Sequence, residues 1–293
     1  MIHTYTVSCL DLQQIHQSGQ CFRMAPLPPG AYPAEAGNGY RVISGSRLLR
    51  AWQDRDHLYL DCPQEDCSFW EAYFDMDTDY EAVIDSIDRR DAYLCEAASH
   101  GRGIRILRQD PWEMIITFVI SQQKTIPGIR QLVEAISRRY GTPIEDTYAF
   151  PSPAQLSAAA LFDLQELKLG YRAKYIHRLC ADAVSGALDL DRLASLDYGE
   201  AMEYLTGFYG IGKKVANCVC LFGLHHVGAF PVDTWIQRIL MEQYYNSKKY
   251  RRTPKTRLLD QMVEDVFGPY GGYAGIMQQY IFYYERLRSS RLS

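Results

Sequence analysis

A lysine and an aspartate are the two residues of this sequence best placed to do chemistry. Lys214 is the second residue after the turn Gly210-Ile211-Gly212, and Asp233 ends the segment Gly228-Ala229-Phe230-Pro231-Val232-Asp233. A lysine amine is a nucleophile only when it is neutral, and burial and a helix N-terminus both favour the neutral form. A carboxylate can stabilise positive charge that develops during a reaction. The pair therefore suits nucleophilic catalysis by an amine near a carboxylate.

Two helices and a tight turn must position Lys214. The apolar spacing predicts one helix over Tyr198 to Phe208 and a second that begins at Lys213, which together form a helix-hairpin-helix. Both turn glycines are expected to supply a positive φ or a close backbone approach. The unpaired N–H groups at the start of the second helix attract an anion such as a DNA phosphate. Pro231 prevents helix continuation, so Asp233 is expected to cap a helix that begins near Thr234.

The stretch resembles the helix-hairpin-helix (198–224) and Gly/Pro-Asp segment (228–238) of the base-excision DNA glycosylase superfamily, whose bifunctional members carry a lysine at the place of Lys214. The resemblance implies that Lys214 attacks C1′ of a flipped nucleotide. The departing base leaves an imine, and β-elimination nicks the strand. Asp233 would steady the charge on the sugar, while Gly210, Gly212 and Lys213 would clamp DNA phosphates. This chemistry needs no metal or organic cofactor.

A second motif near the N-terminus points to the damaged base. The segment 9–23 ends in Ser18-Gly19-Gln20-Cys21-Phe22-Arg23 and resembles the N-terminal motif of 8-oxoguanine DNA glycosylases. In that family the main-chain carbonyl at the place of Gly19 reads the lesion. Cys218 lies four residues after Lys214 on the same helical face, so it is expected to pack on one face of the base.

The C-terminal segment 272–284 resembles the closing helix of the same family. One register matches Gln278 to a base-reading glutamine and Phe282 to a stacking phenylalanine, whereas an ungapped register selects Gly275 and Gln279. We prefer the first, because it keeps the glutamine and the phenylalanine four residues apart on one helical face.

Two further segments are expected to contact DNA. The apolar helix predicted over residues 112–123 ends in Gln122 and Gln123, and the family brings this segment to the base opposite the lesion. Gln123 and Gly128 stand where the eukaryotic enzymes have an asparagine and an arginine, so the sequence leaves the preferred opposite base open. In Leu169-Gly-Tyr-Arg-Ala-Lys-Tyr175, we expect Tyr171 and Arg172 to project from the turn. The tyrosine would wedge into the gap left by the flipped nucleotide, and the arginine would donate to the orphaned base.

The sequence predicts an α+β fold in two domains. Period-two patterning over Thr4 to Asp61 predicts antiparallel strands at 39–44, 46–52 and 57–60, with a turn at 53–56. From Cys67 onward the apolar spacing is helical. We therefore expect an N-terminal antiparallel-sheet domain with flanking helices over residues 1–105. A mostly α-helical catalytic domain is expected over residues 106–293.

Composition limits the other possibilities. The net charge of −4 in 293 residues excludes a surface coated in basic residues, so any DNA site must be local. Cys62 and Cys67 look too isolated for a metal site, and no cysteine follows Cys220 to build the iron-sulfur loop of some relatives. No membrane span or secretory signal is apparent.

We therefore expect an intracellular monomer, in a prokaryotic cytoplasm or a nucleus, that excises 8-oxoguanine from double-stranded DNA. A glycosylase of the same superfamily for another damaged base is an alternative. A non-catalytic DNA-binding protein that uses the hairpin only as a phosphate clamp is another.

Overall fold

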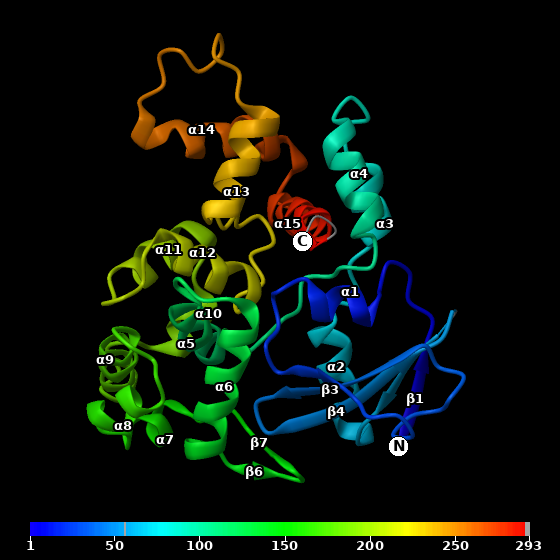
Figure 1. Cartoon of the computed structure of the whole chain (residues 1–293), viewed down its shortest axis with the longest axis vertical. Helices are drawn as coiled ribbons and strands as arrows, with labels where there is room; N and C mark the ends of the chain where they lie inside the picture. Colours follow the sequence, from blue (N-terminus) through cyan, green and yellow to red (C-terminus); the bar gives the residue numbers. More distant parts are fainter. Residues whose placement is uncertain (56, 291–293) are drawn as a thin grey trace.

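The structure is a computed structural model that describes residues 1–55 and 57–290. An antiparallel sheet made by the N-terminal part of the chain lies beside a larger assembly of helices (Figure 1). This arrangement confirms the predicted α+β class. Asp56, the last residue of the turn predicted over 53–56, lies outside the described residues.

The sheet has five antiparallel strands in the order β1-β5-β4-β3-β2. The hairpin between β3 and β4 turns at Gly45, whose φ of 57° is left-handed and therefore suits glycine. The three strands predicted from alternation correspond to β3, β4 and β5. The strands are β1 Ile2–Tyr5, β2 Met24–Pro26, β3 Asn38–Ser44, β4 Arg47–Gln53 and β5 Leu58–Asp61.

Short helices cover the sheet and connect it to the rest of the molecule. Leu12 and Ile15 of α1 and Trp70 and Tyr73 of α2 pack with the buried strand residues in one hydrophobic core. Helices α3 and α4 instead contribute to the core of the helical part. The domain boundary expected at 105/106 stays a prediction. The elements are α1 Leu12–Gln17, η1 Gln64–Asp66, α2 Cys67–Tyr73, α3 Tyr80–Asp85 and α4 Ala92–His100.

Helix α5 (Pro111–Ser121) is the centre of the helical part, as its apolar sequence predicted. Every residue after Pro111 is buried, and Asp110 caps the first turn by accepting a hydrogen bond from the Glu113 amide. The other elements surround it: α6 Ile126–Tyr140, β6 Pro143–Ile144, β7 Thr147–Tyr148, α7 Pro153–Ser157, α8 Leu161–Glu166, α9 Arg172–Val184, α10 Leu190–Ser195, α11 Tyr198–Thr206, α12 Lys213–Phe222, α13 Thr234–Ile239, the π-helix η2 Leu240–Tyr244, α14 Lys255–Phe267, η3 Gly268–Tyr270 and α15 Ala274–Ser290.

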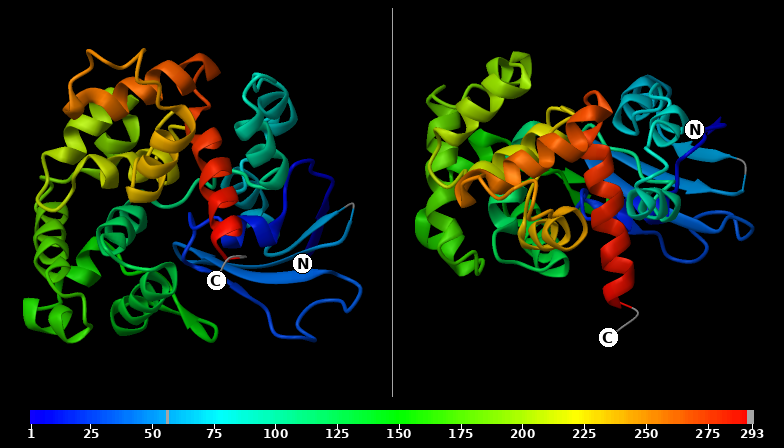
Figure 2. Two further views of the ribbon diagram at one scale, coloured as in Figure 1. Left: turned by 45° about the horizontal axis from the view of Figure 1, so that its top comes forward. Right: turned by 90° about the horizontal axis from the view of Figure 1, so that it is seen from above.

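The C-terminal helix α15 returns to the N-terminal part of the chain. It packs against α4 on one side and α13 on the other, so it runs between the two halves of the molecule (Figure 2). Near its end the guanidinium of Arg286 donates to the Gln17 carbonyl at 2.5 Å. Residues from both ends of the sequence therefore lie in contact. Among the described residues, no helix is both long and apolar enough to cross a membrane.

Candidate active site

The helix-hairpin-helix forms as predicted, but its two glycines have different roles. Gly210 has a φ of 92°, and a Cβ there would lie 2.4 Å from Cγ of Tyr175, so both conformation and space require glycine. Gly212 has an ordinary extended backbone with a φ of −92°. A Cβ there would meet no atom within 4 Å. Gly210 therefore shows both the positive φ and the close approach that were predicted, whereas Gly212 shows neither within the fold; it caps α12 without a side chain and leaves the helix start open.

Lys214 points from the first turn of α12 toward the end of α5. Its Nζ lies 3.2 Å from Oγ of Ser121 and 5.3 Å from the centroid of the Phe118 ring. The neighbouring Lys213 points elsewhere, because its Nζ pairs with Asp260 at 2.5 Å and its side chain is 64% exposed. Two adjacent lysines thus have different environments, and Lys214 is the one held against buried groups.

Asp233 caps α13, as the preceding proline predicted. Its Oδ1 accepts hydrogen bonds from the backbone amides of Trp235 at 3.0 Å and Ile236 at 2.8 Å. Both bonds go to one oxygen, so the cap does not use the second. Asp233 lines the same cavity as Lys214, which brings a carboxylate and an amine from two separate helices to one place.

The cavity has a volume of about 130 Å³. Besides Lys214 and Asp233, it is lined by the four residues expected to recognise the base, which are Gly19, Cys218, Gln278 and Phe282. Burial raises the pKa of the Cys218 thiol, while Lys214 and Asp233 act on it in opposite directions. The raised pKa keeps this thiol neutral and therefore weakly nucleophilic.

Gly19 is held by a buried loop. The Gln20 side chain donates to the Arg105 carbonyl at 2.9 Å and accepts from the Leu107 amide at 2.9 Å, while Ser18 and Gln20 are fully buried. Gly19 itself has a φ of 80°, and a Cβ there would lie 3.0 Å from Cδ1 of Ile126 and 3.4 Å from the Phe282 ring. Its neighbours therefore anchor the loop, and the absent side chain leaves room beside Phe282.

Two adjacent glutamines of α15 reach the cavity. Gln278 and Gln279 are both buried, and the amide nitrogen of Gln279 donates to Oε1 of Gln278 at 2.9 Å. Gly275 belongs instead to helix packing, because a Cβ there would lie 2.4 Å from the Ala229 carbonyl oxygen. The register with Gln278 and Phe282 thus matches two cavity residues, whereas Gly275 of the other register does not line the cavity. Gln279 of the other register also lines the cavity, and the sequence alone does not show that both amides face inward.

Outside the cavity lies a wider groove that shares Lys214 and Asp233 with it. Gln122, Gln123 and Trp235 line this groove. The amide of Gln122 donates to the Gly210 carbonyl at 3.1 Å, and Gln123 is exposed with a φ of 53°. No pattern in the sequence marks Trp235, because its exposure at the helix start depends on the fold.

Of the two residues predicted to project from the turn before α9, only one does. Tyr171 does project and is 44% exposed. Arg172 does not, because it is buried and its guanidinium donates to the carbonyls of Leu169, Gln122 and Gln123. A donor group already bonded to backbone carbonyls is not free for an orphaned base. Arg172 instead holds the backbone that carries Gln122 and Gln123.

Comparison with known proteins identifies the family. Residues 3–115 match the model of the 8-oxoguanine DNA glycosylase N-terminal domain, and residues 116–263 match that of the HhH-GPD superfamily of base excision DNA repair proteins. A Saccharomyces cerevisiae protein called N-glycosylase/DNA lyase is 32% identical over 93% of this chain and 82% of its own length. The chain belongs to the 8-oxoguanine DNA glycosylase family. It is therefore an enzyme of base excision DNA repair.

Other members of the family agree in sequence and in shape. A probable N-glycosylase/DNA lyase of Methanothermobacter thermautotrophicus is 30% identical over 96% of this chain and 95% of its own length. The 8-oxoguanine glycosylase/lyase of Clostridium acetobutylicum was solved with double-stranded DNA that contains cytosine opposite 8-oxoguanine. It superposes with a TM-score of 0.86 at 29% identity, over 99% of this chain and 98% of that one. The glycosylase fold thus extends over nearly the whole chain.

Proposed function

We propose that the enzyme excises 8-oxoguanine from double-stranded DNA through a Schiff base on Lys214 and then nicks the strand by β-elimination. One observation carries this proposal: Lys214, Asp233 and the four expected base-recognition residues line a single cavity although they come from distant parts of the sequence. Because one chain supplies all six residues, the proposal requires only a monomer. It places the enzyme inside the cell, where its DNA substrate is.

In the proposed reaction, the neutral Nζ of Lys214 attacks C1′ of the flipped nucleotide. A bond forms between Nζ and C1′, and the bond from C1′ to the base breaks, so the base leaves with the electron pair and takes up a proton. Nζ then loses a proton, the C1′–O4′ bond breaks as the C1′=Nζ double bond of the protonated imine forms, and O4′ takes up a proton. Loss of a proton from C2′ then forms a C2′=C3′ double bond and breaks the C3′–O bond, so the 3′ phosphate leaves with the electron pair. The Ser121 hydroxyl, 3.2 Å from Nζ, would orient the amine.

Asp233 is proposed to stabilise the positive charge that develops on the sugar as the base departs. Its cap at α13 fixes the carboxylate, because two backbone amides hold Oδ1. A charge that is already oriented costs no reorganisation when the transition state forms. The capping bonds and the catalytic role therefore belong together.

Selection of the lesion is proposed to depend on one hydrogen. 8-Oxoguanine carries N7–H, a donor, where guanine presents an acceptor, and a main-chain carbonyl can only accept. The Gly19 carbonyl would thus favour the lesion, and a mismatched buried polar pair costs about 1–3 kcal/mol. Phe282 and Cys218 would pack on the two faces of the base, and the Gln278 amide would read its Watson–Crick edge. These three contacts are common to guanine and add affinity without selectivity.

We call six residues outside the cavity the rim and propose that they hold the DNA: Gln122, Gln123, Tyr171, Gly210, Gly212 and Lys213. The open start of α12 at Gly212 and the close turn at Gly210 offer amides to a phosphate, with Lys213 beside them. Tyr171 would wedge into the stack, and Gln122 and Gln123 would face the strand opposite the lesion. Arg172 supports this edge from behind through its bonds to the Gln122 carbonyl.

Single-turnover excision with three duplexes tests this proposal. The duplexes carry 8-oxoguanine, 8-bromoguanine or guanine at the same position, and strand nicking is read on a gel. We expect excision and nicking of 8-oxoguanine only. Equal excision of 8-bromoguanine, which is bulky at C8 but has an acceptor N7, would contradict the role of Gly19. Excision of an alkylated base but not of 8-oxoguanine would contradict the proposed substrate.

A further inference from the structure

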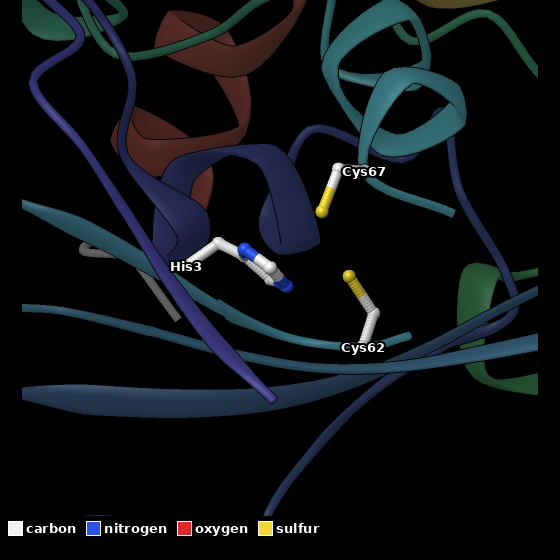
Figure 3. A group of neighbouring side chains, drawn as sticks. All are labelled: His3, Cys62 and Cys67. Carbon is white, nitrogen blue, oxygen red and sulfur yellow. The ribbon is translucent and has the colours of Figure 1, made fainter. Parts of the chain in front are cut away.

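We propose that His3, Cys62 and Cys67 form a binding site for a zinc-class transition metal ion in the sheet domain. The candidate ligand atoms of these three residues all lie within 4.8 Å of one another. Figure 3 shows the imidazole and the two sulfur atoms pointing toward one another from β1, from the segment after β5 and from the start of α2. None of the three residues lines the cavity that holds Lys214, so the site is separate from the active site.

The fold brings together residues that look unrelated in the sequence. His3 of β1 pairs with Leu60 of β5, and the two side chains therefore point to the same face of the sheet. Leu60 is fully buried, and Cys62 follows two residues later, with its amide bonded to the Met1 carbonyl at 3.1 Å. After the turn of η1, Cys67 begins α2. The two cysteines looked too isolated for a metal site because their third partner comes from a neighbouring strand.

The geometry needs only small side-chain movements. With Zn–S near 2.3 Å and Zn–N near 2.0 Å, tetrahedral ligand atoms lie about 3.5–3.8 Å apart. A contraction of at most about 1.0–1.3 Å from the observed limit of 4.8 Å achieves this separation. The two cysteines are buried, and Nε2 of His3 is buried without a hydrogen-bond partner among the described residues. A bound ion would satisfy this nitrogen.

The ligand types determine which ion the site prefers. Two thiolates and one imidazole suit Zn²⁺ and similar soft or borderline ions, whereas Mg²⁺ and Ca²⁺ need oxygen ligands. Each thiol loses its proton to solvent as its metal–sulfur bond forms. The weak contact of the Cys67 thiol with the Pro63 carbonyl, at 3.8 Å, is then given up. Three protein ligands leave a fourth position for water.

The expected consequence is structural. The ion would tie the edge strand β1 to the end of β5 and to the first residue of α2. Binding to the folded state alone raises thermal stability by mass action. Metal occupancy should therefore raise the melting temperature of the full-length enzyme without changing its excision rate.

Titration of the reduced full-length protein with Co²⁺, and then with Zn²⁺, tests the proposal. We expect a thiolate-to-cobalt absorption band that saturates at one ion per chain and disappears when Zn²⁺ displaces the cobalt. Cys62→Ser and Cys67→Ser should each abolish the band. His3→Ala, which keeps both thiols, should weaken binding by roughly 10–100-fold or more, at least as much as removing an outer hydrogen-bond partner of a metal ligand.

Matched controls lie elsewhere in the fold. Cys95→Ser on α4 and His177→Ala on the exposed face of α9 should titrate like the wild type. A reduced wild-type protein without a thiolate band would overturn the proposal, and so would a band that survives in both Cys62→Ser and Cys67→Ser. Full affinity in His3→Ala would remove His3 from the site. These readouts do not use excision, so they do not depend on the proposed chemistry at Lys214.

Discussion

The cavity and the rim of the active site differ in how they are built. Cavity residues come from five separate segments and are held by buried packing, as with Gly19 between Ile126 and Phe282. Rim residues such as Gln123 and Tyr171 are exposed, and side-chain hydrogen bonds from Arg172 hold the backbone of Gln122 and Gln123. We infer that the cavity performs the chemistry and the rim positions DNA. Substitutions in the cavity should therefore change excision rates, and those at the rim should change binding.

Among the substitutions that lower excision without abolishing it, Asp233→Asn should lower the excision rate most. The substitution removes the charge but keeps an oxygen that can cap α13, because asparagine and aspartate cap about equally well. We expect single-turnover excision of 8-oxoguanine to fall about 10²–10³-fold. Thermal stability and DNA binding should change little.

The matched control is Asp189→Asn, a remote cap of α10 that accepts a hydrogen bond from the Arg192 amide. It should leave excision unchanged. Near wild-type excision by Asp233→Asn would reduce Asp233 to a structural cap and would break the division between cavity and rim.

Gly19→Ala should follow in size. Its Cβ would lie 3.0 Å from Ile126 at a φ of 80°, so the loop must shift and the carbonyl with it. We expect excision of 8-oxoguanine to fall by roughly 5–150-fold, the equivalent of 1–3 kcal/mol for a mismatched buried polar pair. Excision kinetics at saturating enzyme would measure the loss.

Gly186→Ala controls for backbone strain alone, because Gly186 also has a φ of 80° but a Cβ there would meet no atom within 4 Å. It should lower stability slightly and leave excision unchanged. Equal losses of excision in both variants would trace the effect to strain rather than to the cavity.

Arg172→Lys tests whether the rim contributes to DNA binding rather than to the excision step. A lysine ammonium cannot donate the set of hydrogen bonds that the guanidinium makes to the carbonyls of Gln122 and Leu169. We expect duplex DNA affinity to fall by about 1 kcal/mol, roughly fivefold, with the excision step nearly unchanged. Fluorescence anisotropy and single-turnover kinetics separate the two quantities.

Arg178→Lys is the control, since Arg178 lies on the same helix and forms an exposed pair with Asp182. Its affinity should match the wild type. A slower excision step with unchanged affinity in Arg172→Lys would mean that Arg172 acts on the cavity instead.

The smallest expected effect is the dependence of the excision rate on the base opposite the lesion. Gly128 supplies no guanidinium, and Arg172 is engaged with backbone carbonyls, so neither position offers a free arginine to the opposite base. Excision rates opposite cytosine, thymine, adenine and guanine should differ by less than the 1–3 kcal/mol that one bidentate contact typically provides. Gly128→Arg should increase the preference for cytosine. A strong wild-type preference for cytosine would show that another rim residue reads this base.

The sequence predicted the cavity better than the rim for a physical reason. A helix start, a cap and a left-handed loop restrict Lys214, Asp233 and Gly19 respectively. Such restrictions can be recognised from residue type and spacing. Arg172 was misplaced because a guanidinium serves equally well to bind DNA or to hold a backbone carbonyl, and only the fold decides between them.

The same limit applies to contacts between distant segments. The inward position of Gln279 and the neighbours of Cys62 depend on how α15 and β1 pack, which one sequence does not reveal. The strands at 39–44 and 46–52 and the helix after Pro111 were predictable, because their patterns are local.

Borohydride trapping of the enzyme on 8-oxoguanine DNA tests the central claim most directly, because it captures the imine itself. Lys213→Gln is the matched control, since Lys213 is adjacent in sequence but pairs with Asp260 outside the cavity. We predict a covalent adduct for the wild type and for Lys213→Gln, and DNA binding without any adduct for Lys214→Gln. An adduct that survives in Lys214→Gln and is lost in Lys213→Gln would contradict the account.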